Sequence, residues 1–79
     1  MLVDVVLPQT GASMTDADIV SVLVSVGTRV SEGDEVLEFE SAKVSDVVKA
    51  TQAGTIAEIL VEAGDTVAVG AVLLRIKAE

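Results

Sequence analysis

The chain has 79 residues and carries 13 acidic against 5 basic side chains, for a formal net charge of −8. This length leaves room for one domain, 1–79, which would bury about 60% of its unfolded surface. The negative charge repels phosphate backbones and anionic lipids, which excludes nucleic acid and membrane surfaces as preferred partners. Because the chain has neither Cys nor His, the usual zinc ligands and the usual general base are missing, and we expect no zinc site of the usual kind.

Apolar stretches separated by turn-forming residues predict an all-β chain. Hydrophobic residues make up 51% of the sequence and aromatic residues 1%, and a composition rich in β-branched side chains favours strands. The first strand is expected over 2–7 and ends at Pro8, because proline has no N–H for a central ladder. The further predicted strands are 19–24, 36–39, 44–48, 56–61 and 72–76. Residues 9–18 are predicted to form a loop, and 28–34 a second loop that turns Val30 inward.

Two of these strands also carry predictions about which side chains share a face. In the strand 19–24 the residues expected on one face are Val20, Val22 and Val24. In the strand 72–76, Leu74 and Ile76 are expected to face opposite to Leu73 and Arg75. Met14, in the first predicted loop, is interpreted as a gap-filling core side chain.

A shift of 37 residues lays the second half of the chain on the first. The coinciding residues are Leu23 with Leu60, Val24 with Val61, Gly27 with Gly64, Val30 with Val67, Gly33 with Gly70, Leu37 with Leu74 and Phe39 with Ile76. Each half alone would leave an apolar face uncovered, whereas two halves related by a pseudo-twofold axis bury those faces against each other. The repeat therefore predicts a small flattened β-barrel or sandwich, with both termini at the end opposite the central turn.

Lys43 lies in that central turn, between the predicted strands 36–39 and 44–48. Ser41 and Ala42 are small enough to let the active site of another protein close over the tip, which leaves the Lys43 amine as the one long reactive group there. A lysine in a turn is most often simply solvated. Sequence features outside the turn are therefore needed to distinguish a solvated Lys43 from a functional one.

Short motifs along the whole chain carry a resemblance to a known family. They are Leu7-Pro8, Gly11, Ser13-Met14-Thr15, Gly27-Thr28-Arg29-Val30, Gly33-Asp34, Glu40-Ser41 before Lys43, Gly54-Thr55-Ile56, Gly64-Asp65-Thr66-Val67 and Gly70. On these residues the chain resembles the lipoyl domain of the dihydrolipoamide acyltransferase component of 2-oxo acid dehydrogenase complexes. The resemblance implies two four-stranded antiparallel sheets with pseudo-twofold symmetry, and lipoic acid in amide linkage to Lys43 at a hairpin tip.

The residues around Lys43 match the family in part. Glu40 corresponds to the acidic residue three before the lysine, and Ser41 to the small hydroxyl residue after it. The family usually has Asp directly before the lysine, where this chain has Ala42, so a charge that a decarboxylase could recognise is missing. The residues that the resemblance implies for recognition of the tip are Glu40, Ser41, Ala42, Val44 and Asp46. Asp46 could supply part of the missing charge, or Ala42 is a harmless substitution in the turn.

The resemblance also implies a set of partners. A lipoate ligase or lipoyl transferase would load Lys43, and a thiamine-dependent 2-oxo acid decarboxylase would transfer an acyl group to the arm. An acyltransferase core would then pass the group to coenzyme A, and dihydrolipoyl dehydrogenase would reoxidise the dithiol. The chain would be a carrier domain or subunit, not an enzyme by itself, and monomeric in isolation.

Three other functions compete with the lipoyl carrier. A biotin carboxyl carrier shares the fold, but methionines normally flank its lysine, where this chain has Ala42 and Val44. A glycine-cleavage carrier is typically longer. An unmodified interaction module would dock on its partners through its acidic face.

The sequence contains no membrane span or signal peptide that we can identify. No run approaches the ~20 apolar residues of a membrane helix, and the stretch 2–7 is too short for a signal core and is interrupted by Asp4. We therefore expect the chain in the cytoplasm of a bacterium or archaeon, or, if a transit segment was removed, in the mitochondrial matrix.

Overall fold

The computed structural model describes residues 1–9, 13–42 and 44–79 and forms two antiparallel sheets there. The strands are β1 (Leu2–Val6), β2 (Asp16–Val22), β3 (Arg29–Val30), β4 (Glu35–Glu40), β5 (Ser45–Lys49), β6 (Gly54–Ile59), β7 (Thr66–Ala68) and β8 (Val72–Ala78). The first sheet has the order β1-β8-β6-β3 and the second the order β5-β4-β2-β7. The described residues form no helix that could cross a membrane.

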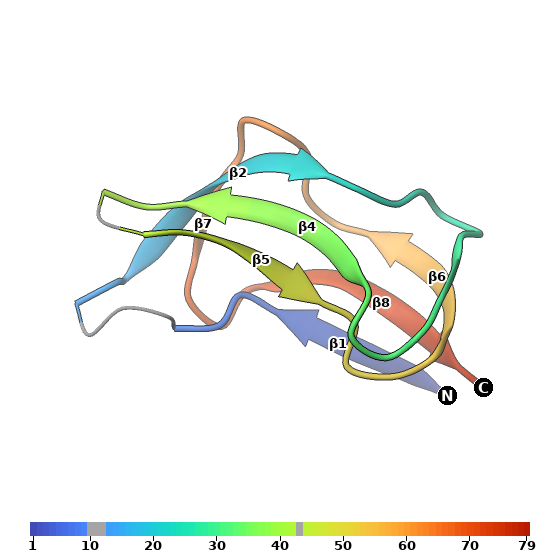
Figure 1. The fold of residues 1–79 in the computed structure, drawn as a ribbon. Helices are drawn as coiled ribbons and strands as arrows, with labels where there is room; N and C mark the ends of the chain where they lie inside the picture. The colour runs from blue at the N-terminus through green and yellow to red at the C-terminus, as the bar shows by residue number, and fades with distance from the viewer. Residues whose placement is uncertain (10–12, 43) are drawn as a thin grey trace.

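The two sheets stack face to face as a flattened sandwich (Figure 1), which measures 35 × 21 × 17 Å. The prediction of two four-stranded antiparallel sheets is thereby confirmed. Buried side chains from both sheets fill the space between them, and Phe39, the one aromatic residue, is 1% exposed. The core residues are Val5, Leu7, Met14, Ala17, Ile19, Val30, Val36, Leu37, Phe39, Val48, Ala50, Ile56, Leu73, Leu74 and Ile76. Met14 belongs to the core, as predicted.

The backbone hydrogen bonds confirm the internal repeat. Gly27 N–H donates to the carbonyl of Ile56, and, 37 residues on, Gly64 N–H donates to the carbonyl of Ile19, each at 2.8 Å. The four glycines that the repeat pairs, Gly27 with Gly64 and Gly33 with Gly70, all have φ between 90° and 96°. That region of φ/ψ space favours glycine because it has no Cβ, so the turns of both halves are built in the same way.

The second strand begins earlier and faces differently than predicted. β2 starts at Asp16, because the alternation of Asp16, Ala17 and Asp18 already places an apolar residue inward. The register between β2 and β4 then shifts between Ile19 and Ser21. Such a bulge reverses the facing of the residues after it, so Val20 is 46% exposed while Val22 and Val24 pack against the core. The prediction that Val20 shares a face with Val22 and Val24 was wrong.

A bulge on β8 also changes which side chains of the last strand face the core. On β8 the register skips Leu73, since Val5 pairs with Leu74 and Val6 with Val72. Leu73 and Leu74 are therefore both fully buried, and the prediction that they face opposite sides was wrong. The repeat places an equivalent bulge on β4, where Val36 and Leu37 are both buried.

Short strands occupy the predicted loop 28–34 and the stretch between the predicted strands 56–61 and 72–76. Val30 is 4% exposed, as expected for an inward valine. It belongs, however, to β3, which pairs with β6, and the equivalent β7 pairs with β2. A pair of only two or three residues leaves no alternating pattern in the sequence, so these strands could not be recognised in advance.

The turn before β4 is closed by a side chain. The Asp34 Oδ2 atom accepts a hydrogen bond from Ser31 N–H at 2.8 Å, and Asp34 N–H donates to the Ser31 carbonyl at 3.0 Å. We expect Asp34→Ala to lower the free energy of unfolding by about 1 kcal/mol, which for a domain of this size lowers Tm by about 4–8 °C. Thermal unfolding followed by circular dichroism measures this. Glu32→Ala in the same turn is the control, and an equal loss in the two variants would contradict the role of Asp34.

Candidate functional site

The tip of the β4–β5 hairpin is the candidate site. Glu40 pairs with Ser45 at the end of the two strands. Beyond that pair, Ser41 N–H donates to the Val44 carbonyl at 2.7 Å. The chain thus reverses between Ser41 and Val44, and only Ala42 and Lys43 separate these two residues in the sequence. Lys43 itself lies outside the described residues, so its placement at the tip stays a prediction.

The residues predicted to surround Lys43 are accessible in the structure. Glu40, Ala42 and Asp46 are exposed, and Ser41 and Val44 are half-buried. The Asp46 Oδ1 atom accepts a hydrogen bond from Val47 N–H at 2.8 Å. An accessible turn of small residues leaves room for an enzyme to close over it.

The tip lies at the end of the sandwich opposite both chain termini (Figure 1), as predicted. The chain segments on either side of residues 10–12, in the first predicted loop, lie at the same end as the tip (Figure 1), and Gln9 and Ser13 are exposed. The Gln9 Nε2 atom donates to the Met14 carbonyl at 3.3 Å. Residues 10–12 lie outside the described part of the chain. A partner that approaches this end therefore meets the hairpin and both flanks of that loop.

The outer face of the first sheet carries an arginine paired with two carboxylates. Arg75 on β8 lies between Asp4 on β1 and Glu58 on β6, its register partners on the two sides. Its Nε atom donates to Asp4 Oδ1 at 2.8 Å and its Nη1 atom to Glu58 Oε2 at 3.1 Å. The hydrogen bond to Asp4, with the negative charge of Asp4, raises the pKa of Arg75.

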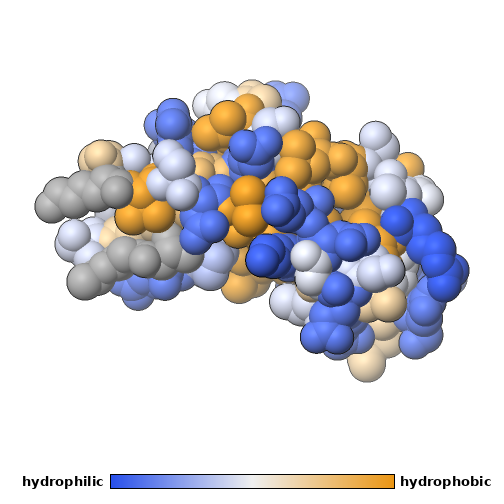
Figure 2. Space-filling view, in the orientation of Figure 1, coloured by the Kyte–Doolittle hydropathy of each residue, from blue (hydrophilic) through white to orange (hydrophobic). Residues whose placement is uncertain are grey.

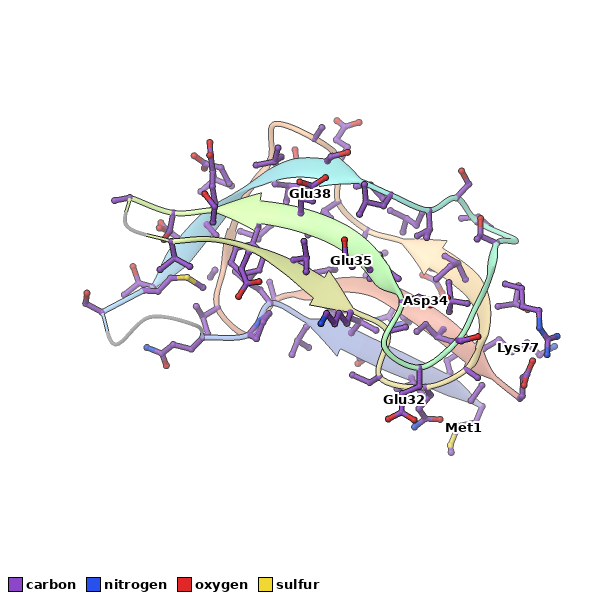
Figure 3. The ribbon with its side chains drawn as sticks, in the orientation of Figure 1. Met1, Glu32, Asp34, Glu35, Glu38 and Lys77 are labelled. Carbon is purple, nitrogen blue, oxygen red and sulfur yellow. The ribbon has the colours of Figure 1, made fainter. Side chains whose placement is uncertain are left out.

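The outer face of the second sheet, which includes the hairpin, has a different charge pattern. Asp18 on β2 lies directly opposite Glu40 on β4, and Glu38 lies further along β4 (Figure 3). Like charges directly across a ladder are destabilising. Within the described part of the chain, the Asp18 carboxylate accepts a hydrogen bond from Thr66 Oγ1, at 2.7 Å. Apolar and hydrophilic surface alternate on this side of the molecule (Figure 2).

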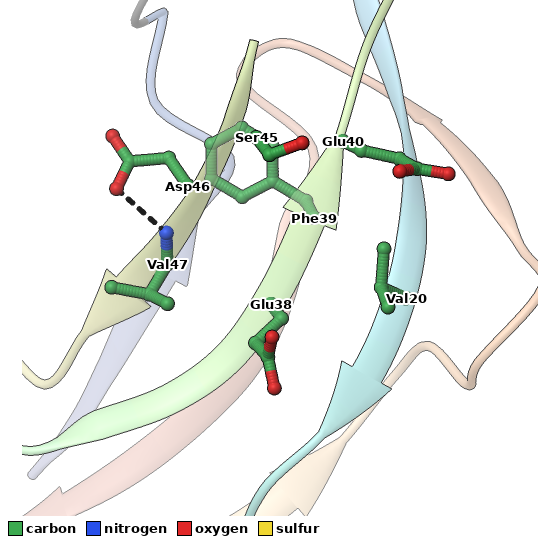
Figure 4. A pocket seen from close by; sticks show the side chains of 7 residues that line it. All are labelled: Val20, Glu38, Phe39, Glu40, Ser45, Asp46 and Val47. Atoms are coloured by element: carbon green, nitrogen blue, oxygen red, sulfur yellow. Dashed lines mark hydrogen bonds between the residues drawn. The ribbon is translucent and has the colours of Figure 1, made fainter.

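This second face holds residues that sequence reasoning did not select. Val20, Glu38 and Val47 line a shallow groove beside Glu40 (Figure 4). No local pattern marks them, because they meet only through the register of three strands. The two valines would otherwise be assigned to the core.

Comparison with known proteins agrees with this fold and hairpin. Residues 3–76 match the biotin and lipoyl attachment family, described as "biotin-requiring enzyme". The chain therefore belongs to the biotinyl/lipoyl attachment domain family, and as a carrier domain it is not catalytic by itself. The family predicted from the sequence motifs is confirmed.

Individual relatives point to the lipoyl branch of this family. The chain is 42% identical over 73 residues to the dihydrolipoyllysine-residue acetyltransferase component of the pyruvate dehydrogenase complex of Corynebacterium glutamicum. This match covers 92% of the chain and 11% of that relative. It is 36% identical over 73 residues to the lipoamide acyltransferase component of the branched-chain α-keto acid dehydrogenase complex of Bacillus subtilis. That match covers 92% of the chain and 17% of the relative.

A solved lipoyl domain has the same fold. The lipoyl domain of the 2-oxoglutarate dehydrogenase complex from Azotobacter vinelandii superposes with a TM-score of 0.76 and 29% identity, with 95% of each chain covered. The chain thus corresponds to a whole lipoyl domain but to a small part of the acyltransferases it matches.

Proposed function

We propose that this domain carries lipoic acid in amide linkage to Lys43 and shuttles acyl groups and reducing equivalents between the active sites of a 2-oxo acid dehydrogenase complex. The observation that carries the proposal is the hairpin closed between Ser41 and Val44, at the end of the molecule opposite both termini. The similarity to dihydrolipoyllysine acyltransferases supports the choice of lipoic acid.

The chain's own part in this chemistry is attachment and presentation. The Lys43 amine, in its transiently deprotonated form, attacks the carbonyl carbon of an activated lipoyl adenylate held by a ligase. The new C–N bond forms as the bond between the carbonyl carbon and AMP breaks, and the nitrogen loses its proton. The side chain, as an amide, no longer carries a positive charge. Once bound, the group supplies a disulfide that accepts electrons and an acyl group. Glu40, Ser41, Ala42, Val44 and Asp46 form the surface that the modifying enzyme and the complex would recognise.

The partners follow from the same proposal. They are a lipoate ligase or lipoyl transferase, a thiamine-dependent 2-oxo acid decarboxylase, the acyltransferase core and dihydrolipoyl dehydrogenase. Tethering at the termini would keep the tip at high local concentration near each active site in turn. The compartment would be the one that holds such a complex.

Biotin is the alternative prosthetic group, because both groups use this fold. The carboxylases among the similar proteins include the urea carboxylase of Kluyveromyces lactis, whose structure superposes with a TM-score of 0.80 at 26% identity, covering 96% of this chain and 6% of that protein. The residues on either side of Lys43, Ala42 and Val44, favour lipoic acid.

Intact mass after modification in vitro tests the proposal. The purified domain is incubated with a lipoate ligase, ATP and lipoate, and separately with a biotin ligase, ATP and biotin. We expect a near-complete gain of one lipoyl group in the first reaction and no gain in the second. A gain only with biotin would establish the carboxyl carrier, and no gain in either reaction would leave the acidic interaction module as the better hypothesis.

A further inference from the structure

The two halves of the chain, residues 1–42 and 44–79, build both sheets together. Among the strand pairs of the described residues, β1 with β8, β2 with β7, β3 with β6 and β4 with β5 each join one half to the other. The pairs of β2 with β4 and of β6 with β8 lie within one half. Most of the pairing is therefore an interface between the halves, whereas the peptide link between them is the tip of the β4–β5 hairpin (Figure 1).

β8 and β1 pair in the same way as the two strands of the β4–β5 hairpin. At the tip, Ser41 N–H donates to the Val44 carbonyl at 2.7 Å. At the opposite end of the molecule, where the two chain ends lie side by side (Figure 1), Ala78 N–H donates to the Met1 carbonyl at 3.0 Å. Ala78 is 37 residues after Ser41, so the repeat that relates the halves also relates these two bonds. The adjacent register partners match as well, Glu40 with Ser45 and Lys77 with Leu2.

The far ends of these two strand pairs are also equivalent. Gly33 N–H donates to the Ala50 carbonyl at 2.8 Å, and Gly70 N–H donates to the Leu7 carbonyl at 3.0 Å. Ala50 and Leu7 are both buried. β1 thus has the place in the first sheet that β5 has in the second, although no turn joins β8 to β1. The pairing between the halves keeps these two strands in register without a peptide link at that end.

One residue separates this chain from a closed ring of two equivalent halves. The repeat leads from β4 to β8 by a shift of 37 residues, and β5 lies on β1 by a shift of 43, since Val44 corresponds to Met1. Together the two shifts make 80 residues, and the chain has 79. Two residues lie between the bonded residues of the tip, whereas Glu79 alone would lie between Ala78 and Met1 if the termini were joined. The position between Glu79 and Met1, which we call the terminal gap, therefore corresponds to Lys43.

We propose that the two halves are mutual binding partners that form the sandwich without the peptide link at the tip, and that a one-residue link across the terminal gap can replace it. The pair of β8 with β1 supports this inference, because it keeps the register of the hairpin with no turn. The tip residues then have no role in joining the halves, and their sequence is free to serve recognition by other proteins. This inference does not depend on the proposed attachment of lipoic acid.

A circular permutant with the composition of the unaltered chain tests the proposal. It begins at Val44, runs to Glu79, continues through a single lysine to Met1 and ends at Ala42, so that one lysine moves from the tip to the terminal gap. Because one short link replaces an equivalent one, we expect a monomer that unfolds cooperatively, with a Tm within about 10 °C of the unaltered domain. Light scattering and far-ultraviolet circular dichroism measure this. Failure to form a cooperatively folded monomer, or a larger loss of Tm, would overturn the proposal.

Two matched deletions test whether the tip and the terminal gap are equivalent. One omits the linking lysine from the permutant, so that Glu79 is joined directly to Met1, and the other omits Lys43 from the unaltered chain. Each leaves a single residue between the bonded residues of its turn, and the length of a hairpin loop determines the turn that can close it. We therefore expect Tm to fall in both, relative to the corresponding longer chain, by amounts within about twofold of each other. Losses that differ more than this, or no loss in either chain, would show that the two ends are not equivalent and would overturn the proposal.

Discussion

Replacing Gly54 by alanine is expected to lower the free energy of unfolding by about 3 kcal/mol. A Cβ atom at Gly54 would lie 2.2 Å from the carbonyl oxygen of Lys77 and 2.8 Å from Cγ2 of Ile76. The nearer contact is with backbone, so β6 and β8 would have to separate where Gly54 pairs with Ala78. A domain of this size is stabilised by roughly 4–12 kcal/mol in total, so this substitution should lower Tm by about 10–25 °C.

Far-ultraviolet circular dichroism is the suitable probe, because the chain has no Trp or Tyr for fluorescence. Gly33→Ala is the control for the same substitution without the collision. Gly33 has a φ of 91°, and a methyl group added there would have nothing within 4 Å, so its alanine variant suffers only backbone strain of about 1–2 kcal/mol. If Gly54→Ala were no less stable than Gly33→Ala, the close packing of β6 on β8 would be disproved.

Replacing Lys43 by arginine is expected to abolish the lipoyl mass gain completely while Tm changes by less than about 2 °C. Arginine keeps the positive charge and the length of the side chain, but its guanidinium stays protonated and does not act as a nucleophile. A residue in an accessible turn between Ser41 and Val44 should contribute little to the core. The measurement is intact mass after ligase treatment, with thermal unfolding of the same samples.

Lys49→Arg provides the matched control for this experiment. Lys49 ends β5, is exposed, and is one of the two other lysines. We expect Lys49→Arg to be modified as fully as the unaltered domain. Retained modification in Lys43→Arg would place the attachment elsewhere, whereas a large drop in Tm would indicate that Lys43 has a structural role.

Much of the architecture could be predicted because both halves of the chain carry the same information. Gly27 and Gly64 mark equivalent turns, and hydrophobic alternation marks most of the strands. Leu37 and Phe39, which the repeat pairs with Leu74 and Ile76, are buried as those two residues are. The repeat also predicted that the central turn and the termini lie at opposite ends.

The errors arose where cross-strand pairing, and not local pattern, decides the outcome. Val20 and Leu73 lie at bulges, and a bulge inverts the facing of a strand without any mark in an alternating sequence. β3 and β7 are too short to show a period. The groove could not be predicted for the same reason, since Val20, Glu38 and Val47 become neighbours only when β2, β4 and β5 align.

The order of strands in the two sheets also has a consequence for how the domain is made. Among the described pairs, only β4 and β5 are neighbours in the chain. Within the described residues β1 pairs with β8, the last of these eight strands to be synthesised. At about 5–20 residues per second, the first strand waits roughly 4–15 seconds for its partner. Until then its apolar side chains stay exposed to the surrounding cell, whereas β2, β4 and β5 can pair with one another as soon as residue 49 has been made.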